Sequence, residues 1–364
     1  MKVVVLQDNF SKILSTATRF VSTRAQLPVL NNIKLVAKAA KLEIYATNLE
    51  TSFYTSLGAK LEEEGEISVP AKTITDIINN LADNQVNLVA AKETLAITTE
   101  NFKSTLAGIN TSDFPDISVN AGKGAFSIDT QKLTDVLANV LFSVSSDETR
   151  PILTGVFIKF EQDTLVLVST DGFRLTESKI EGVKAKAEDI IIPKSALSEV
   201  MKLFDSEESL EVNIDKENSQ VIFEAGNTTL ATRSLGSEFP DYKKRIPEKS
   251  SIEVKVDRES LQRAVRLGSV FARESSNIVR ISVEKDSLEL AAESSKSGTQ
   301  ENKVDAEVAG GEIEIAFNYK YLEEVLNVLD SEEVILEFND TNSPMVVKSP
   351  KVKNFIHIIM PVKV

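Results

Sequence analysis

Apolar and polar positions along the chain follow a pattern that occurs three times. Each unit opens with a short strand and a helix whose apolar residues recur every three or four positions, at 9–20, 130–142 and 258–271. Strands in which every second residue is apolar come next, at 41–47, 164–170 and 287–293. A second helix follows in each unit, at 71–81, 194–204 and 319–329. Further alternating strands, such as 87–99 and 209–215, close the unit.

Nearly constant offsets relate the three units. A shift of 123 residues superposes Pro28 on Pro151 and Thr47 on Thr170, and "FPD" recurs at 114–116 and 239–241. A third copy is fainter, with "VKVDRESLQRAV" similar to "FSIDTQKLTDVL" at an offset of 128. Because self-similarity at a fixed period indicates repeated structural units, the sequence predicts three domains of ordinary size. Their predicted bounds are 1–122, 123–248 and 249–364.

The predicted fold class is α+β. Alternating strands in each unit favour antiparallel sheets with one buried face, and the two helices would share one face of those sheets. Three such units give six helices. The six helical windows together carry a net charge of +1, whereas the whole chain carries −14. A near-neutral helical layer would suit helices that alone face a polyanion, although surface helices often balance their charges for other reasons.

Composition excludes several kinds of chemistry. The chain has no Cys and a single His, His357, so disulfides, thiolate metal sites and two-His metal motifs are excluded, and we expect no metal and no cofactor. No run of about eighteen apolar residues occurs, and Asp8 interrupts the apolar start too early for a secretory signal. These observations predict a cytoplasmic protein that does not enter membranes. His357 lies in an apolar stretch and is interpreted as a strand residue.

The stretch "TDGFRL" at 170–175 raises a choice between a catalytic acid and a turn. Asp-Gly favours a tight reversal because Gly accepts positive φ and Asp tolerates it, so Asp171 is interpreted as a turn residue. The alternative is an enzyme that uses carboxylates, with Asp171, Asp147 and Glu148 as acid, base or metal ligands. A β-rich scaffold without a role on DNA is a second alternative.

The chain resembles the bacterial DNA sliding clamp family, the beta subunit of DNA polymerase III, over its whole length. The segments that carry the resemblance are "LPVLNNI" at 27–33, "TDGFRL" at 170–175, "FPDYKKRIP" at 239–247, "FNYKYLEEVLNVL" at 317–329 and "MPVKV" at 360–364. The resemblance implies a head-to-tail homodimer, closed into a ring of six domains, with helices lining a hole for duplex DNA of any sequence. It implies no catalysis. The expected partners are the replicative polymerase, the clamp loader and other polymerases and repair proteins.

The resemblance also implies a hydrophobic groove for short peptide motifs of those partners. Its expected lining is Leu153, Thr170, Gly172, Phe173, Arg174, Leu175, Pro240, Lys244, Arg245, Met360, Pro361, Val362 and Val364. The chain departs from the family at three of these positions: Phe173 where a His is common, Arg245 where an aliphatic is common, and Val364 where a Leu is common. We expect these changes to alter the preferred motif. An ordinary closing strand is the alternative for the C-terminal residues.

DNA contacts and ring closure are further implications of the resemblance. Arg24, Lys72 and Arg150 are the expected contacts to phosphate, each with a solvated surface charge as the alternative. Pro151 and Ile152 follow Arg150 where the family often has an aromatic pair, so stacking on exposed template is not implied here. Ring closure would join the expected interface residues Lys103, Leu106, Val270 and Phe271. Burial of Phe271 in its own domain is an equal alternative.

Overall fold

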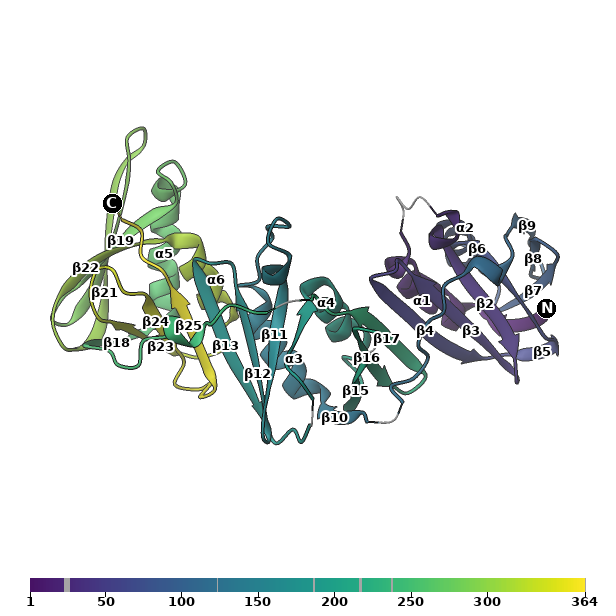
Figure 1. The fold of residues 1–364 in the computed structure, drawn as a ribbon. Coiled ribbons are helices and arrows are strands. Elements are labelled where there is room, and N and C mark those ends of the chain that lie inside the picture. The colour runs from purple at the N-terminus through teal and green to yellow at the C-terminus, as the bar shows by residue number, and fades with distance from the viewer. Residues whose placement is uncertain (23–26, 123, 186, 216–217, 237, 364) are drawn as a thin grey trace. The chain divides into compact units, whose positions relative to one another are not determined.

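The chain forms two compact units in the computed structural model (Figure 1). The structure describes all residues except 23–26, 123, 186, 216–217, 237 and 364. The first unit contains 1–130 and 202–234, and the second contains 131–201 and 235–364. The central repeat of the sequence therefore contributes strands to both units.

The first unit contains two antiparallel sheets and two α-helices. The five-stranded sheet has the order β5 (Lys60–Glu63), β1 (Lys2–Leu6), β7 (Gln85–Ala91), β8 (Thr94–Thr98), β9 (Lys103–Ala107). The eight-stranded sheet has the order β10 (Phe126–Asp129), β15 (Ser209–Asp215), β16 (Gln220–Ala225), β17 (Thr228–Arg233), β4 (Thr51–Gly58), β3 (Lys41–Thr47), β2 (Asn32–Lys38), β6 (Gly65–Pro70). The helices are α1 (Gln7–Ala17) and α2 (Ala71–Asn79), with short 3₁₀ helices η1 (Thr18–Phe20), η2 (Pro28–Asn31) and η3 (Thr111–Asp113).

Helices α1 and α2 pack side by side. Helix α1 buries Phe10 and Leu14, four residues apart, and α2 buries Ile74 and Ile78 at the same interval. Each helix therefore has one apolar face, as its sequence predicts. The opposite faces remain polar.

The second unit contains one antiparallel sheet of twelve strands. Its order is β14 (Ile190–Pro193), β11 (Gly155–Glu161), β12 (Thr164–Thr170), β13 (Arg174–Glu181), β25 (Phe355–Ile359), β24 (Met345–Lys348), β23 (Glu333–Phe338), β18 (Ile252–Asp257), β21 (Gly298–Ala309), β20 (Ser287–Ser294), β19 (Ile278–Val283), β22 (Ile313–Asn318). The helices are α3 (Thr130–Leu141), α4 (Lys194–Leu203), α5 (Arg258–Ala272) and α6 (Tyr319–Val328), with η4 (Pro151–Thr154) and η5 (Lys243–Arg245). Only the first residue of α3, Thr130, and the last two of α4, Lys202 and Leu203, belong to the first unit.

Helices α5 and α6 each begin at a side-chain cap. Asp257 accepts a hydrogen bond from the backbone N–H of Ser260 at 2.8 Å, and Asn318 accepts one from Lys320 at 3.1 Å. A capping side chain satisfies a backbone donor that the first helical turn leaves unpaired. The two helices pack against each other. Their buried faces join a core with Val254, Leu290 and Phe317.

The pairing of β13 with β25 joins chain segments that are far apart in sequence. In this register Leu175 lies opposite Ile358, and Thr176 lies opposite His357. The backbone N–H of Met360 extends the pairing by donating to the Phe173 carbonyl at 2.9 Å. This junction places the turn between β12 and β13 beside the C-terminal segment.

All six predicted helices are present, and every sheet pairing between the described strands is antiparallel. The α+β prediction is therefore confirmed. The division into three domains at 122 and 248 remains a prediction.

Candidate functional site

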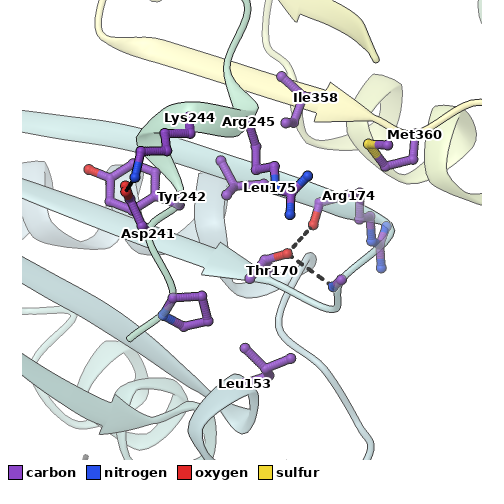
Figure 2. Close-up of a pocket in the computed structure, with 12 residues that line it drawn as sticks. Leu153, Thr170, Arg174, Leu175, Asp241, Tyr242, Lys244, Arg245, Ile358 and Met360 are labelled. Atoms are coloured by element: carbon purple, nitrogen blue, oxygen red, sulfur yellow. Dashed lines mark hydrogen bonds and ion pairs between the residues drawn. The ribbon is translucent and has the colours of Figure 1, made fainter. Parts of the chain in front are cut away.

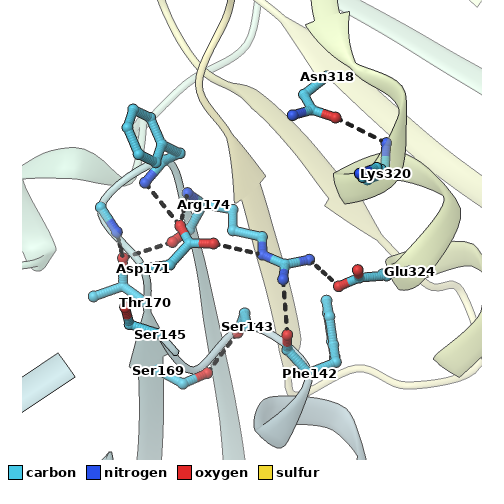
Figure 3. Close-up of polar contacts among 12 residues, drawn as sticks. Phe142, Ser143, Ser145, Ser169, Thr170, Asp171, Arg174, Asn318, Lys320 and Glu324 are labelled. Carbon is cyan, nitrogen blue, oxygen red and sulfur yellow. Dashed lines mark hydrogen bonds and ion pairs between the residues drawn. The ribbon is translucent and has the colours of Figure 1, made fainter. Parts of the chain in front are cut away.

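The turn from Thr170 to Arg174 is held by hydrogen bonds from its own side chains (Figure 3). Asp171 Oδ1 accepts from the backbone N–H groups of Phe173 at 2.9 Å and Arg174 at 3.1 Å. Thr170 Oγ1 accepts from the N–H of Gly172 at 3.0 Å and donates to the Arg174 carbonyl at 2.5 Å. Gly172 has φ of +96°, which a residue with a side chain rarely adopts. Asp171 is thus a turn residue, as predicted.

The side chain of Arg174 is buried beneath this turn. Its guanidinium donates to Asp171 Oδ2 at 3.0 Å, Glu324 Oε2 at 2.5 Å and the Phe142 carbonyl at 2.8 Å (Figure 3). It also lies over the rings of Phe142 and Tyr321, at 5.4 and 4.7 Å from their centroids. Arg174 therefore ties the turn to the end of α3 and to α6, and a buried cation with this many partners is structural in effect.

A chain of buried hydroxyl groups lies next to Arg174. Ser143 bonds to Ser169 at 2.5 Å and to Thr176 at 2.7 Å, and Thr176 bonds to His357 Nδ1 at 2.8 Å. Burial, with a smaller contribution from the Arg174 charge, lowers the pKa of His357 to about 3. Its Nε2 has no hydrogen-bond partner among the described residues. A fully buried, neutral imidazole on strand β25 agrees with the interpretation of His357 as a strand residue.

A cavity of about 770 Å³ opens beside the turn (Figure 2). The β12–β13 segment, η4, the β25 segment and the chain around η5 all contribute to it. Its lining is Leu153, Thr170, Gly172, Arg174, Leu175, Pro240, Asp241, Tyr242, Lys244, Arg245, Ile358 and Met360. The volume lies within the range of ligand sites, and a mostly apolar lining with a few polar groups is typical of them.

Nine of the thirteen predicted groove residues line this cavity. Phe173 does not; its side chain is 59% exposed at the tip of the turn. Pro361 and Val362 also lie outside the lining, and Val364 lies outside the described residues. Val362 lines a separate, polar hollow with Arg280.

The sequence interpretation did not include three lining residues. Asp241 and Tyr242 lie within the quoted "FPDYKKRIP" segment, next to Pro240. Ile358 lies two positions before Met360, and because residues two apart in an extended chain share a face, the prediction of Met360 could have led to Ile358.

The C-terminal segment is fixed at two points. Besides the bond from Met360 to Phe173, the N–H of Val362 donates to the Ala316 carbonyl of β22 at 2.8 Å. Met360 therefore lines the cavity from a segment that backbone hydrogen bonds hold at Met360 and at Val362.

The first unit contains a related junction with different chemistry. Strand β4 pairs with β17 so that Ser52 lies opposite Ala231, and the N–H of Arg233 donates to the Glu50 carbonyl at 2.9 Å. These correspond to the Leu175–Ile358 pair and to the bond from Met360. Small residues (Ser52, Ala231) and charged residues (Glu50, Arg233) thus occupy the positions that are large and apolar in the second unit.

The three predicted DNA contacts have different surroundings. Arg24 lies outside the described residues. Lys72 is exposed in the first turn of α2. Arg150 forms an ion pair with Asp147 at 2.9 Å, and its Nη1 lies 3.1 Å from where a Cβ on Gly172 would be, beside the turn of the cavity. Hydrogen bonds from Thr149 and Arg150 hold the pKa of the Asp147 carboxyl below its usual range.

The predicted ring-contact residues lie on one edge strand and one helix. Lys103 and Leu106 belong to β9, at the edge of the five-stranded sheet, with Lys103 exposed and Leu106 half-buried. On α5, Val270 is 58% exposed and the nearby Leu267 is 51% exposed. Phe271 is half-buried against the core of the second unit. The exposed apolar pair on α5 is the type of surface that protein partners cover.

Metal-binding clusters and membrane-spanning helices are both absent from the described residues. Among the described residues, no three His, Asp or Glu side chains gather in a way that could hold a metal ion. None of the described helices is both long and apolar enough to span a membrane.

Comparisons with known proteins cover nearly the whole chain. Family models described as the DNA polymerase III beta subunit match with their N-terminal domain at 1–118, central domain at 127–241 and C-terminal domain at 243–363. The beta sliding clamp of Synechococcus elongatus is 31% identical, covering 100% of this chain and 99% of that protein. The beta sliding clamp of Staphylococcus aureus is 29% identical with the same coverage.

Solved structures give the same result. The DNA polymerase sliding clamp from Bacillus subtilis superposes with a TM-score of 0.95 at 26% identity, covering 100% of this chain and 99% of that one. The DNA polymerase III subunit beta from Pseudomonas aeruginosa superposes with a TM-score of 0.94 at 25% identity, over the full length of both chains.

Proposed function

The chain belongs to the DNA polymerase III beta subunit family, the bacterial sliding clamps, and from this premise we propose how its own residues perform the work of a clamp. Two copies associate head to tail and close a ring around duplex DNA, so that retention depends on topology and not on base sequence. The ring itself catalyses no reaction. A clamp that acts on the bacterial chromosome acts in the cytoplasm.

The cavity beside Thr170–Arg174 is the surface that we propose for holding partners. The observation that carries this proposal is that segments far apart in sequence present Leu153, Leu175 and Met360 to one opening of about 770 Å³. A peptide could bury apolar side chains there with little reordering of the clamp, since hydrogen bonds already fix the turn and the C-terminal segment. A peptide groove tethers the replicative polymerase and, by exchange, the clamp loader and repair polymerases. Tethering raises the effective concentration of each partner at the template.

Lys72 and Arg150, with Arg24, are the residues that we propose for contacts to phosphate. Each contact of this kind strengthens binding without reading sequence, and a clamp that slides needs few of them. Arg150 lies beside the groove turn, so its contact would fall near the partner site. Lys103 and Leu106 of one copy would meet Val270 and Phe271 of the other to close the ring.

Retention on circular DNA tests the proposed function. The protein, loaded onto a nicked circle by a clamp loader, is expected to remain bound through gel filtration at high salt and to leave once a restriction enzyme linearises the circle. A topological link predicts both results, whereas a protein held only by phosphate contacts would dissociate in salt before cutting. Equal loss from circular and linear DNA would exclude the ring.

A further inference from the structure

The 3₁₀ helix η5 carries three consecutive cations, and their surroundings differ. Lys243 Nζ lies 3.2 Å from Glu161 Oε1, outside the cavity. Lys244 Nζ lies 2.6 Å from Asp241 Oδ2, and both side chains are exposed at the rim. In the part of the chain that the structure describes, the guanidinium of Arg245 has no carboxylate within ion-pair distance. Arg245 is thus the cation of η5 that remains available to a ligand.

The side chain of Arg245 extends into the cavity among apolar residues. Figure 2 shows its side chain pointing toward the Thr170–Arg174 turn, in a cavity whose lining also includes Leu153, Leu175 and Ile358. Two carboxylates of the same segments already have cationic partners. Asp171 pairs with the buried Arg174, and Asp241 pairs with Lys244. No described residue supplies a counter-charge to this guanidinium.

We propose that Arg245 makes this groove selective for peptide segments that carry an Asp or Glu side chain between their apolar anchors. The carboxylate would accept paired N–H bonds from the guanidinium while the flanking anchors occupy the apolar lining. An acidic side chain within the segment fits better than a terminal carboxylate, because the cavity offers several apolar lining residues besides Arg245, and a chain that ended at Arg245 would leave part of that lining empty. This inference rests on the proposed function of the groove.

Selectivity follows from desolvation as much as from attraction. Arg245 is exposed to water in the free chain, and a peptide that fills the cavity removes part of that water. A neutral peptide would leave the guanidinium desolvated without a partner, which opposes binding, whereas an acidic peptide replaces the lost water with charged hydrogen bonds. The same residue therefore favours one class of segment and disfavours the other.

A displayed library of random peptides tests the proposal on three proteins: the unmodified chain, Arg245→Gln and Lys243→Gln. Lys243→Gln is the matched control, since it removes the same charge from η5 outside the cavity. The unmodified chain and Lys243→Gln are expected to enrich peptides with an acidic residue between apolar residues. Arg245→Gln is expected to enrich apolar peptides without the acidic residue. Equal acidic content on all three proteins would overturn the proposal.

Synthetic peptides from the selection then give the size of the effect. Each is made with its acidic residue or the matching amide, acetylated and amidated at its ends, and titrated by calorimetry. We expect the amide form to bind the unmodified chain about ten-fold more weakly, as for one charge-assisted hydrogen-bonded pair that remains partly solvated, and to bind Arg245→Gln no more weakly than the acidic form. Equal affinity of the two forms for the unmodified chain overturns the role of Arg245 but leaves the groove in place. The proposal is also overturned if a free peptide C-terminus raises the affinity by as much as the side-chain amide lowers it, because Arg245 would then bind a terminal carboxylate.

Failure of the groove itself gives a different result. If peptides enriched on the unmodified chain bind Met360→Ser as tightly as they bind the unmodified chain, they do not occupy this cavity. That outcome contradicts the proposed partner site as well as the role of Arg245.

Discussion

Two Asp-x-x-Arg pairs show how burial changes the meaning of one sequence pattern. In Asp171–Arg174 the arginine side chain is 8% exposed and has partners on three segments, whereas in Asp147–Arg150 it is 46% exposed and has one ion-pair partner among the described residues. Both pairs have nearly the same length, 3.0 and 2.9 Å. Removing one partner of a buried ion pair lowers stability strongly, because it leaves an uncompensated buried charge, whereas an exposed ion pair contributes little to stability.

Replacing these two arginines should therefore change the unfolding free energy by very different amounts. Arg174→Ala is expected to lower the free energy of unfolding by roughly 3 kcal/mol, because it leaves Asp171 and the Phe142 carbonyl without their buried cation. Arg150→Ala, the matched control, should leave the unfolding free energy nearly unchanged. Chemical denaturation of both variants measures the difference. Similar losses in the two would mean that Arg174 is not the tie between the turn and α6.

His357 should make stability depend on pH in the acidic range. Its pKa is about 3 in the folded chain against 6.5 in the unfolded chain, so the unfolded state binds more protons between these values. The contribution of the neutral imidazole is fully present above pH 6.5 and is lost as the pH falls toward 3. The slope from this one group approaches about 1.4 kcal/mol per pH unit. His357→Gln should remove that slope, as measured by denaturation at pH 7, 6 and 5. An unchanged slope would mean that His357 gains its proton while folded.

At the level of single residues, the sequence predicts what local chemistry decides. The Asp-Gly reversal at 171–172 needs only its own neighbours, so its turn could be predicted. The Arg174 side chain depends on Phe142, Tyr321 and Glu324, which come from two other segments. No local pattern reports such partners, and the predicted role of Arg174 as a groove residue captured its position but not its burial.

At the level of elements, the ordered C-terminal segment is the feature that completes the cavity. Residues after β25 cannot be assigned from alternation, because the strand pattern ends at Ile359 and Pro361 follows. Their position depends on two long-range bonds, to Phe173 and to Ala316. The amphipathic helices and strands could be predicted for the opposite reason. Their apolar residues recur every 3.6 or 2 positions within a short stretch of sequence.

Deleting Met360–Val364 should separate partner binding from folding. Met360 is a wall of the cavity, so binding of a polymerase-derived peptide is expected to fall below detection in a calorimetric titration. The unfolding free energy should decrease by only about 1 to 3 kcal/mol, as expected for two backbone hydrogen bonds. Lys363→Ala keeps both bonds and every predicted groove residue, and is the control. Full peptide affinity in the longer deletion would locate the groove elsewhere.

At the level of the whole molecule, the repeat places the same kind of strand junction in both units, with different side chains. The β4–β17 and β13–β25 pairs share a backbone arrangement, yet Ser52 and Ala231 stand where the second has Leu175 and Ile358. The same backbone junction therefore presents two small side chains in the first unit and two large apolar ones in the second. The offset of 123 relates Ser52 to Leu175 in the sequence, whereas the match of Ala231 to Ile358, at an offset of 127, needed the strand register.

Ring closure should depend on the apolar surface of α5. A closed ring of six repeats requires two chains, so light scattering after size exclusion at micromolar concentration should report about twice the 39.9 kDa chain mass. Val270 is 58% exposed and would be covered in the ring, so Val270→Asp places a charge in an apolar contact and should shift the protein toward monomer.

Leu49→Asp is the control for that substitution, because Leu49 is also an exposed apolar residue, at 44%, but lies on a turn of the first unit away from β9 in the sequence. Leu49→Asp should leave the dimer intact. Both variants should have a melting temperature close to that of the unmodified chain when proteins of the same oligomeric state are compared. The same Val270→Asp protein should lose retention on circular DNA while still binding groove peptides, since the cavity has no residue from α5. Retention on circles by a monomeric Val270→Asp protein would break the link between ring closure and tethering, and a dimer that persists in it would assign the interface to another surface.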